Sequence, residues 1–95
     1  MTMHYIKVFW RHQHRDEPIE LYSELDHGRW EVRKVEVSRD GSLGYASRSG
    51  SRGETLLGLV PVPALAEIAE DPKFEPTEIT KGEFEEIWLR ATRSS

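Results

Sequence analysis

The chain has 95 residues, of which 37% are hydrophobic and 32% are charged, and it contains no cysteine. This length suits one domain with one modest core, so we expect a single α+β domain over residues 1–95. Three Trp, three Tyr and three Phe argue against wholesale disorder. The lack of cysteine excludes disulfides, thiol catalysis and thiolate metal ligands.

The net charge of −4 is unevenly distributed along the chain. Residues 29–54 carry six Lys/Arg against four Asp/Glu, whereas residues 55–95 carry four against eight. An acidic C-terminal third argues against general nucleic-acid binding, which needs a concentrated basic footprint, and it suits docking on a basic partner. Residues 1–10 lack the apolar region of a signal peptide, and no apolar run reaches membrane-spanning length. We therefore expect a cytoplasmic protein with no membrane association.

Two strands are predicted in the first part of the chain. His4–Trp10 is rich in β-branched and aromatic residues, and Ile19–Asp26 alternates apolar with polar residues. In the second strand Leu21 and Leu25 share the predicted core face. Phe9 falls on the other face of its own strand, so either it is exposed or the sheet is covered on both sides.

A two-residue loop at His27-Gly28 is expected to join the second strand to a third. The apolar positions of the third strand shift from even (Trp30, Val32) to odd (Val35, Val37). This shift predicts a β-bulge near residues 33–34, which would place Leu21 opposite Val35.

The second turn, Arg39-Asp40-Gly41, suits a three-residue loop with Gly41 in the left-handed conformation. Ser47–Glu54 is predicted to be a flexible loop by its composition, and Thr55–Val60 a further strand.

Two helices are predicted after residue 60. A short one begins at Pro63 and runs to about Glu70, with Leu65, Ile68 and Ala69 facing inward. The second, Thr80–Ala91, is better specified because Thr80 and Glu83 form a capping box. Its apolar stripe consists of Phe84, Ile87, Trp88 and Ala91.

These elements predict an antiparallel sheet of four to five strands, with the C-terminal helix packed on one face and one short additional helix. The large aromatic side chains are assigned to packing, because they fall on predicted apolar faces: Trp10, Trp30, Phe84 and Trp88.

Outward-facing glutamates form the first candidate site. In the predicted register Glu20 faces Glu36 and Glu24 faces Glu31, and like charges directly opposite each other are destabilising. Nearby basic residues such as Lys7 would make this a solvated, neutralised face; alternatively, it is an acidic docking surface for a basic protein partner. The predicted partner-binding residues are Glu20, Tyr22, Glu24, Glu31, Glu36, Glu83 and Glu86.

A metal site is a weaker candidate. His12 and His14, with Asp16 and Glu17 close by, resemble a ligand set, yet the segment reads as an exposed polar loop without a fixed third ligand. His27 lies beside Asp26, but neighbours in a strand point to opposite faces, which is poor geometry for a base and its orienting carboxylate. We expect no metal, no cofactor and no catalytic residue.

A phosphate or nucleic-acid site is the alternative. The loop SRSGSRGE combines glycines with Arg48 and Arg52, and Arg33 and Lys34 lie on the predicted third strand. The loop matches neither a P-loop nor a dinucleotide fingerprint, and a mobile hairpin tip explains its composition equally well.

Seven segments, taken in order, resemble a family of small bacterial domains of unknown function: HYIKVFW, EPIELYSELD, RWEVRKVEV, DGSLGYA, VPVPALAEI, DPKFEP and EFEEIW. The resemblance spans about His4 to Trp88. Some members of that family look like immunity-type genes that accompany polymorphic toxins, and the resemblance supplies no catalytic residues. The unpaired outward glutamates and the missing catalytic constellation predict a non-enzymatic protein-binding module, most concretely an immunity-type or inhibitor protein that sequesters a bacterial partner through its acidic face.

Overall fold

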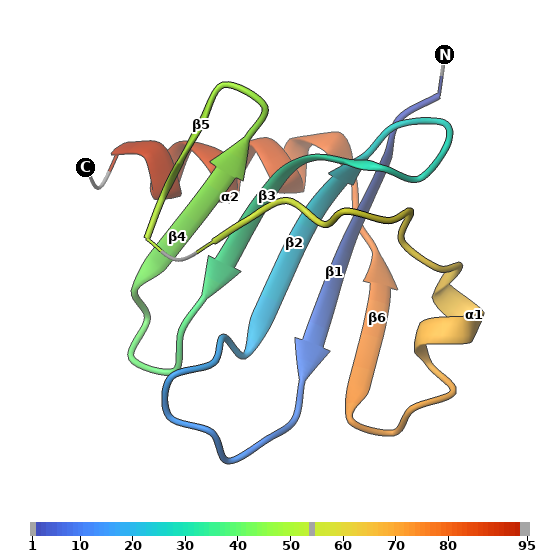
Figure 1. The fold of residues 1–95 in the computed structure, drawn as a ribbon, viewed down its shortest axis with the longest axis horizontal. Coiled ribbons are helices and arrows are strands. Elements are labelled where there is room, and N and C mark those ends of the chain that lie inside the picture. Colours follow the sequence, from blue (N-terminus) through green and yellow to red (C-terminus); the bar gives the residue numbers. More distant parts are fainter. Residues whose placement is uncertain (1, 54, 94–95) are drawn as a thin grey trace.

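The fold is α+β, with a six-stranded antiparallel sheet in the order β5-β4-β3-β2-β1-β6 (Figure 1). The computed structural model describes residues 2–53 and 55–93. The strands are β1 (His4–Trp10), β2 (Glu20–Leu25), β3 (Glu31–Val37), β4 (Leu43–Ser47), β5 (Gly50–Arg52) and β6 (Phe74–Glu78). The helices are α1 (Leu65–Ile68) and α2 (Lys81–Arg93).

The predicted antiparallel α+β architecture is confirmed, but the sheet has six strands rather than four to five. β5 lies within the predicted loop Ser47–Glu54, whose last residue is outside the described residues, and β6 lies in a segment without a strand pattern. In the sequence, Pro76 argues against a strand at this position. At the edge of a sheet, however, proline is tolerated, because no further strand needs the N–H that proline lacks. The predicted strand Thr55–Val60 is irregular chain.

The capping box of α2 is confirmed. The Glu83 N–H donates to Thr80 Oγ1 at 3.1 Å, and the Thr80 N–H donates to Glu83 Oε1 at the same distance. The stripe faces the sheet as predicted: Phe84, Ile87 and Ala91 are buried. By contrast α1 is a single turn, shorter than the predicted helix, and no side chain caps its start at Ala64.

The first hairpin differs from the prediction. Its loop has three residues, His27 to Arg29, with Arg29 in the left-handed conformation (φ 67°). The N–H groups of Gly28 and Trp30 each donate to Asp26 Oδ1 at 3.0 Å, and these bonds lower the pKa of Asp26. The second turn is confirmed, with Gly41 at φ 90°.

The extra loop residue moves the bulge and changes the register. The shift occurs at Val32, where Glu24 pairs with Arg33 and Leu25 with Glu31, rather than near residues 33–34. The predicted opposition of Glu24 and Glu31 is therefore wrong. Leu21 likewise lies opposite Glu36 and not opposite Val35.

Both faces of the sheet are covered, and Phe9 is nevertheless exposed (36%), so each of the two alternatives for Phe9 holds. On the first face α2 packs on Val35, with Tyr22, Leu43 and Tyr45 around it. On the second face Ile6, Val8 and Leu25 form a separate cluster under Val62, Leu65 and Ile68. Trp30 belongs to neither cluster and is 44% exposed, so its assignment to the core was wrong.

Arg33 fixes α2 to the first face. Its guanidinium donates to both carboxylate oxygens of Glu24, at 2.6 and 2.9 Å, and to both oxygens of Glu85 on α2, at 3.0 and 2.8 Å. It also lies 5.0 Å from the ring centres of Phe84 and Trp88. A charge at this depth is stable only because it is fully paired.

Replacing Arg33 by Met should lower the free energy of unfolding by roughly 3 kcal/mol, because Glu24 is left buried and uncompensated. Urea unfolding measures the loss. Arg48→Met is the matched control: Arg48 is exposed and lies 3.5 Å from Asp26, so its loss should stay below about 1 kcal/mol. Equal losses in the two variants would contradict this role for Arg33.

The same cluster should make stability depend on pH. Hydrogen bonds from Arg33 lower the pKa values of Glu24 and Glu85 below the ordinary 4.5. Their stabilisation is therefore complete above pH 4.5 and is lost as the pH falls through the lowered pKa values. Wild type should be more stable than Glu24→Gln/Glu85→Gln at neutral pH, and urea unfolding should show this difference in unfolding free energy closing as the pH falls below 4.5. A gap of constant size would refute the coupling.

Candidate functional site

Residues 55–62, called the strap below, cross the sheet on the face opposite α2 (Figure 1). The strap has no regular secondary structure and leads directly into α1. It lies over the β3 side of the sheet, where it is hydrogen-bonded to four residues of the β2–β3 loop and β3: Arg29, Glu31, Lys34 and Glu36.

Two buried or half-buried glutamates accept hydrogen bonds from the strap. Thr55 Oγ1 donates to Glu36 Oε1 at 2.9 Å, and the Gly58 N–H donates to Glu31 Oε1 at 2.5 Å. Glu31 is 8% exposed, and its other oxygen accepts from Ser23 Oγ at 3.0 Å. A buried carboxylate with this many donors is a fixed anchor and not a free surface charge.

Arg29 closes the far end of the strap. Its backbone oxygen accepts from the Val62 N–H at 2.8 Å, while its guanidinium donates to the carbonyls of Val62 (2.8 Å) and Pro63 (2.7 Å). These bonds explain why a residue other than glycine holds a left-handed conformation here, because they offset its backbone strain.

Gly44 on β4 allows the strap to start close to the sheet. A side chain at this position would collide with Thr55 Oγ1 and would also lie 3.2 Å from the Arg52 carbonyl oxygen. The missing Cβ is thus what lets Thr55 reach Glu36, which lies opposite Gly44 in the sheet.

Three apolar side chains of the strap point into solvent, and we call them the ridge. Leu56 is 72% exposed, Leu59 90% and Val60 68%. Trp30 adds a fourth exposed apolar side chain, on the hairpin whose backbone is bonded to the strap at Arg29. Single exposed apolar residues are ordinary, but several together on one anchored segment mark an interaction surface.

Carboxylates follow the ridge directly in the chain. Glu67, Glu70 and Asp71 are exposed on and just after α1, on the same face of the sheet as the strap, and we call them the acidic shoulder. Lys73 is the nearest basic residue in sequence. The ridge and this patch of negative charge therefore lie on the same face of the sheet.

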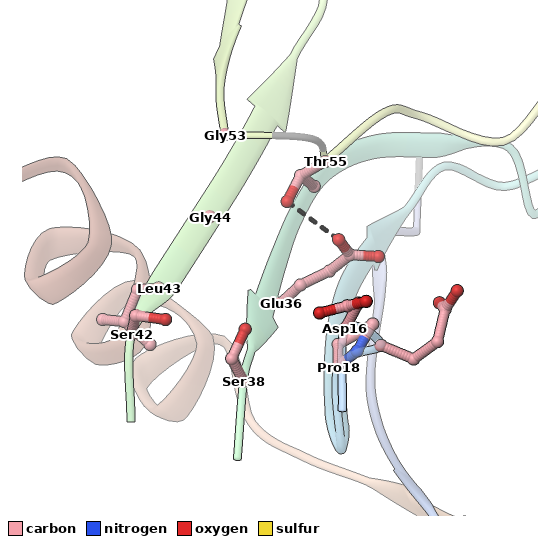
Figure 2. Close-up of a pocket in the computed structure, with 10 residues that line it drawn as sticks. Asp16, Pro18, Glu36, Ser38, Ser42, Leu43, Gly44, Gly53 and Thr55 are labelled. Carbon is pink, nitrogen blue, oxygen red and sulfur yellow. Dashed lines mark hydrogen bonds between the residues drawn. The ribbon is translucent and has the colours of Figure 1, made fainter. Parts of the chain in front are cut away.

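A cavity of about 340 Å³ opens beside the start of the strap (Figure 2). Asp16, Glu17 and Glu36 contribute carboxylates to its wall, and Ser38 and Ser42 contribute hydroxyls. In Figure 2 Thr55 and Glu36 face each other across a hydrogen bond at its edge. Within residues 2–53 and 55–93 no group of three His, Asp or Glu side chains is arranged to hold a metal ion.

A family profile described as a domain of unknown function, DUF6881, matches residues 4–93. The chain belongs to this family. The predicted resemblance to a family of unknown function is thereby confirmed, while the bacterial source and the immunity-type role stay predictions. No curated protein and no solved structure matches the chain. No helix in the described part of this DUF6881 domain is long and apolar enough to cross a membrane.

The seven residues of the predicted acidic face do not lie on one surface of the domain. Tyr22, Glu83 and Glu86 line a small hollow beside α2 together with Lys7, which pairs with Glu20 at 2.9 Å. The other three lie elsewhere: Glu24 is buried under α2, and Glu31 and Glu36 hold the strap on the opposite face. The unpaired outward glutamates expected from the register are thus paired.

The four residues of the predicted phosphate site are also dispersed. Arg33 is held by two carboxylates under α2, and Lys34 lies 3.3 Å from Glu31 and 3.4 Å from the Leu56 carbonyl oxygen. Arg48 pairs with Asp26 at 3.5 Å, while Arg52 lies on β5. Three of the four residues therefore pair with carboxylates of the domain itself.

Of the two histidines of the predicted metal site, His12 is hydrogen-bonded through both ring nitrogens within its own loop. The Nδ1 atom of His12 accepts from the His14 N–H at 3.0 Å, and its Nε2 atom lies 2.7 Å from the Pro18 carbonyl oxygen. Since a carbonyl accepts only, Nε2 carries the proton, and neither nitrogen is left for a metal. The ring also packs on Trp10, with 4.2 Å between ring centres.

Sequence reasoning missed the ridge because it assigned Thr55–Val60 to a strand, which would bury alternate apolar side chains. A usable signal was present in VPVP at residues 60–63, since two prolines remove the N–H groups that a paired strand needs. The acidic shoulder was visible only as an excess of acid in the last third of the chain.

Replacing Glu31 by Ala should free the strap, because the Gly58 N–H and the Ser23 hydroxyl lose their buried acceptor. We expect the Gly58 amide to exchange with solvent about tenfold faster or more, since an orphaned buried group costs about 1–3 kcal/mol. Hydrogen exchange followed by NMR measures the rate. Glu67→Ala, on exposed α1, should leave it unchanged, and an unprotected Gly58 amide in wild type would contradict the anchor.

Proposed function

We propose that this domain is a non-enzymatic protein-binding module whose ridge inserts into an apolar groove of a basic protein partner. The observation that carries the proposal is the exposure of Leu56, Leu59 and Val60 on a segment whose backbone is anchored. An anchored apolar segment binds at a lower entropic cost than a free loop, because most of its ordering precedes binding.

Charge supports a basic partner. The acidic shoulder follows the ridge in the chain and lies on the same face of the sheet, and the whole chain carries a net charge of −4. Basic residues around the partner's groove would meet the shoulder, steer the encounter and set the orientation. In this proposal the negative charge that meets the partner comes mainly from Glu67, Glu70 and Asp71. The glutamates of β2 and β3 instead stabilise the fold through their contacts with other residues of the domain.

The strand edges support docking through the ridge over docking by strand addition. The outer strand β6 has Pro76 at its centre, and Pro76 offers no N–H to an incoming strand. The opposite outer strand, β5, has three residues. A central proline and a very short strand both discourage pairing at the sheet edges, because few backbone N–H and C=O groups are available to an added strand.

An immunity-type or inhibitor protein is the most concrete form of such a module, and it rests on the family resemblance. In that form the ridge would occlude a functional groove of the partner, and affinity would depend on shape and charge without any chemical step by this domain.

The test is photo-cross-linking from position 59 in the native host, followed by affinity measurement with the purified partner. Leu59→Ser/Val60→Ser should weaken the complex about tenfold or more, since truncating a central interface residue costs over about 1 kcal/mol. Glu67→Lys/Glu70→Lys should slow association, most strongly at low salt.

Leu89→Ser is the matched control, because Leu89 is 52% exposed on α2, away from the strap. It should leave the affinity unchanged. An affinity insensitive to Leu59→Ser/Val60→Ser, in variants whose unfolding is unchanged, would contradict the proposal. If the domain self-associates as its concentration rises, and Leu59→Ser/Val60→Ser abolishes this, the partner would be a second copy of the chain.

A further inference from the structure

Two exposed prolines lie where the strap leads into α1. The chain there reads Val60-Pro61-Val62-Pro63-Ala64, and we call this stretch the proline segment. Pro61, Pro63 and Ala64 are exposed, whereas Val62 is half-buried against the apolar cluster of the second face. The segment continues the ridge, because Val60 belongs to both.

Proline chemistry sets the backbone of this segment. The ring of a proline holds φ at about −65°, and a residue that precedes a proline is kept out of the helical region, which applies here to Val60 and Val62. Ala64 has φ −61° and ψ 153°, the angles of a polyproline II helix. The helix α1 begins only at Leu65, so the segment before it follows the extended course of polyproline II.

The side chains of the segment point in three directions. A polyproline II helix has about three residues per turn, so its side chains form three rows. The row of Val62 faces the sheet, on whose apolar cluster this side chain packs. The other two rows face solvent, with Val60 aligned with Pro63 and Pro61 aligned with Ala64. Each outward row therefore combines one proline ring with one small apolar side chain.

The backbone of the segment is already hydrogen-bonded within the domain. The Val62 N–H donates to the Arg29 carbonyl oxygen at 2.8 Å. The carbonyls of Val62 and Pro63 accept from the Arg29 guanidinium at 2.8 and 2.7 Å. Since Pro61 and Pro63 have no N–H, residues 61–63 offer a partner no further backbone donor. Strand addition is therefore disfavoured, and recognition falls to the side chains.

Exposed proline rings in this conformation suit aromatic side chains. Grooves lined by aromatic residues accept proline-containing extended chains, and the entropic cost is low because the polyproline II helix exists before binding. Proline also stabilises a loop simply by restricting the unfolded chain. The bonds to Arg29 and the packing of Val62 already hold this segment, so stiffening alone does not explain two outward rings.

The charge that follows the segment fits a groove with a basic end. Glu67 and Glu70 are exposed, and α1, which carries Glu67, begins directly after Ala64. Basic residues at one end of the groove would meet this acidic shoulder. Opposite charges at that end would fix the direction in which the proline segment lies.

We propose that the partner's groove is lined by aromatic side chains that pack on the rings of Pro61 and Pro63, with basic residues at the end that meets the acidic shoulder. This inference rests on the proposed docking of the ridge and adds the chemistry of the groove. In it, Leu59 and Val60 enter the same groove ahead of the prolines.

The affinity of the partner captured from position 59 tests the inference. Pro61→Ala/Pro63→Ala should weaken the complex about tenfold or more, because the aromatic side chains lose their ring contacts and the segment loses its preset backbone angles. Pro72→Ala is the matched control, since Pro72 is an exposed proline in the turn between α1 and β6. It should leave the affinity unchanged, and equal affinities in the two variants would overturn the inference.

NMR of the wild-type complex separates ring contact from stiffening without any substitution. Protons above the face of an aromatic ring resonate upfield, so the ring protons of Pro61 and Pro63 should move upfield when the partner is added to domain isotopically labelled at proline. Those of Pro18, in the loop between β1 and β2, should not move.

The outcomes distinguish this inference from the proposed function. Unshifted proline resonances, in a complex that Leu59→Ser/Val60→Ser still weakens, would overturn the aromatic groove and leave ridge docking in place. An affinity that depends on neither the ridge nor the prolines, or the absence of any protein that cross-links from position 59, would contradict both proposals.

Discussion

The register of the β2–β3 hairpin is the constraint on which the rest of the structure depends. A three-residue loop with Arg29 in the left-handed conformation places Glu24 opposite Arg33, on the face that α2 covers. The same register turns Glu31 and Glu36 to the other face, where they accept hydrogen bonds from the strap. Because side chains alternate along a strand, a slip of one residue would exchange these two roles and remove both attachments.

The two faces of the sheet are covered through different kinds of contact, and this difference leaves the ridge exposed. Under α2, apolar packing of Phe84 and Ile87 is reinforced by a fully paired arginine. The strap is held through polar contacts of its backbone and of Thr55 and through Val62, which packs on the second cluster. The side chains of Leu56, Leu59 and Val60 are therefore not needed for attachment. A segment anchored by its backbone can present leucine and valine to solvent without coming loose. That combination is costly for a free-standing protein and useful for one that docks, and the docking proposal follows from it.

The elements with strong local signals could be predicted from the sequence. The capping box at Thr80, the three-residue turn ending at Gly41 and the stripe on α2 all depend on neighbours in the chain. What failed depended on distant partners. Arg29 adopts its unusual conformation because of Val62 and Pro63, far along the chain, so the sequence pattern favoured Gly28 as the turn residue instead. The wrong loop length then misplaced the register, and with it Glu31 and Glu36, which were expected on the same face as Glu20 and Glu24.

The most direct test of the account is the solvent exposure of individual methyl groups, measured by NMR with a soluble paramagnetic agent. The account predicts strong broadening for the methyls of Leu56, Leu59 and Val60, comparable with that of Leu89, and little for buried Leu25. The amides of Gly58 and Val62 should stay protected in the same sample, because they are bonded to Glu31 and Arg29. If Leu59 and Val60 proved as protected as Leu25, the strap would bury its apolar side chains in the sheet. The ridge would then not exist as a surface for a partner.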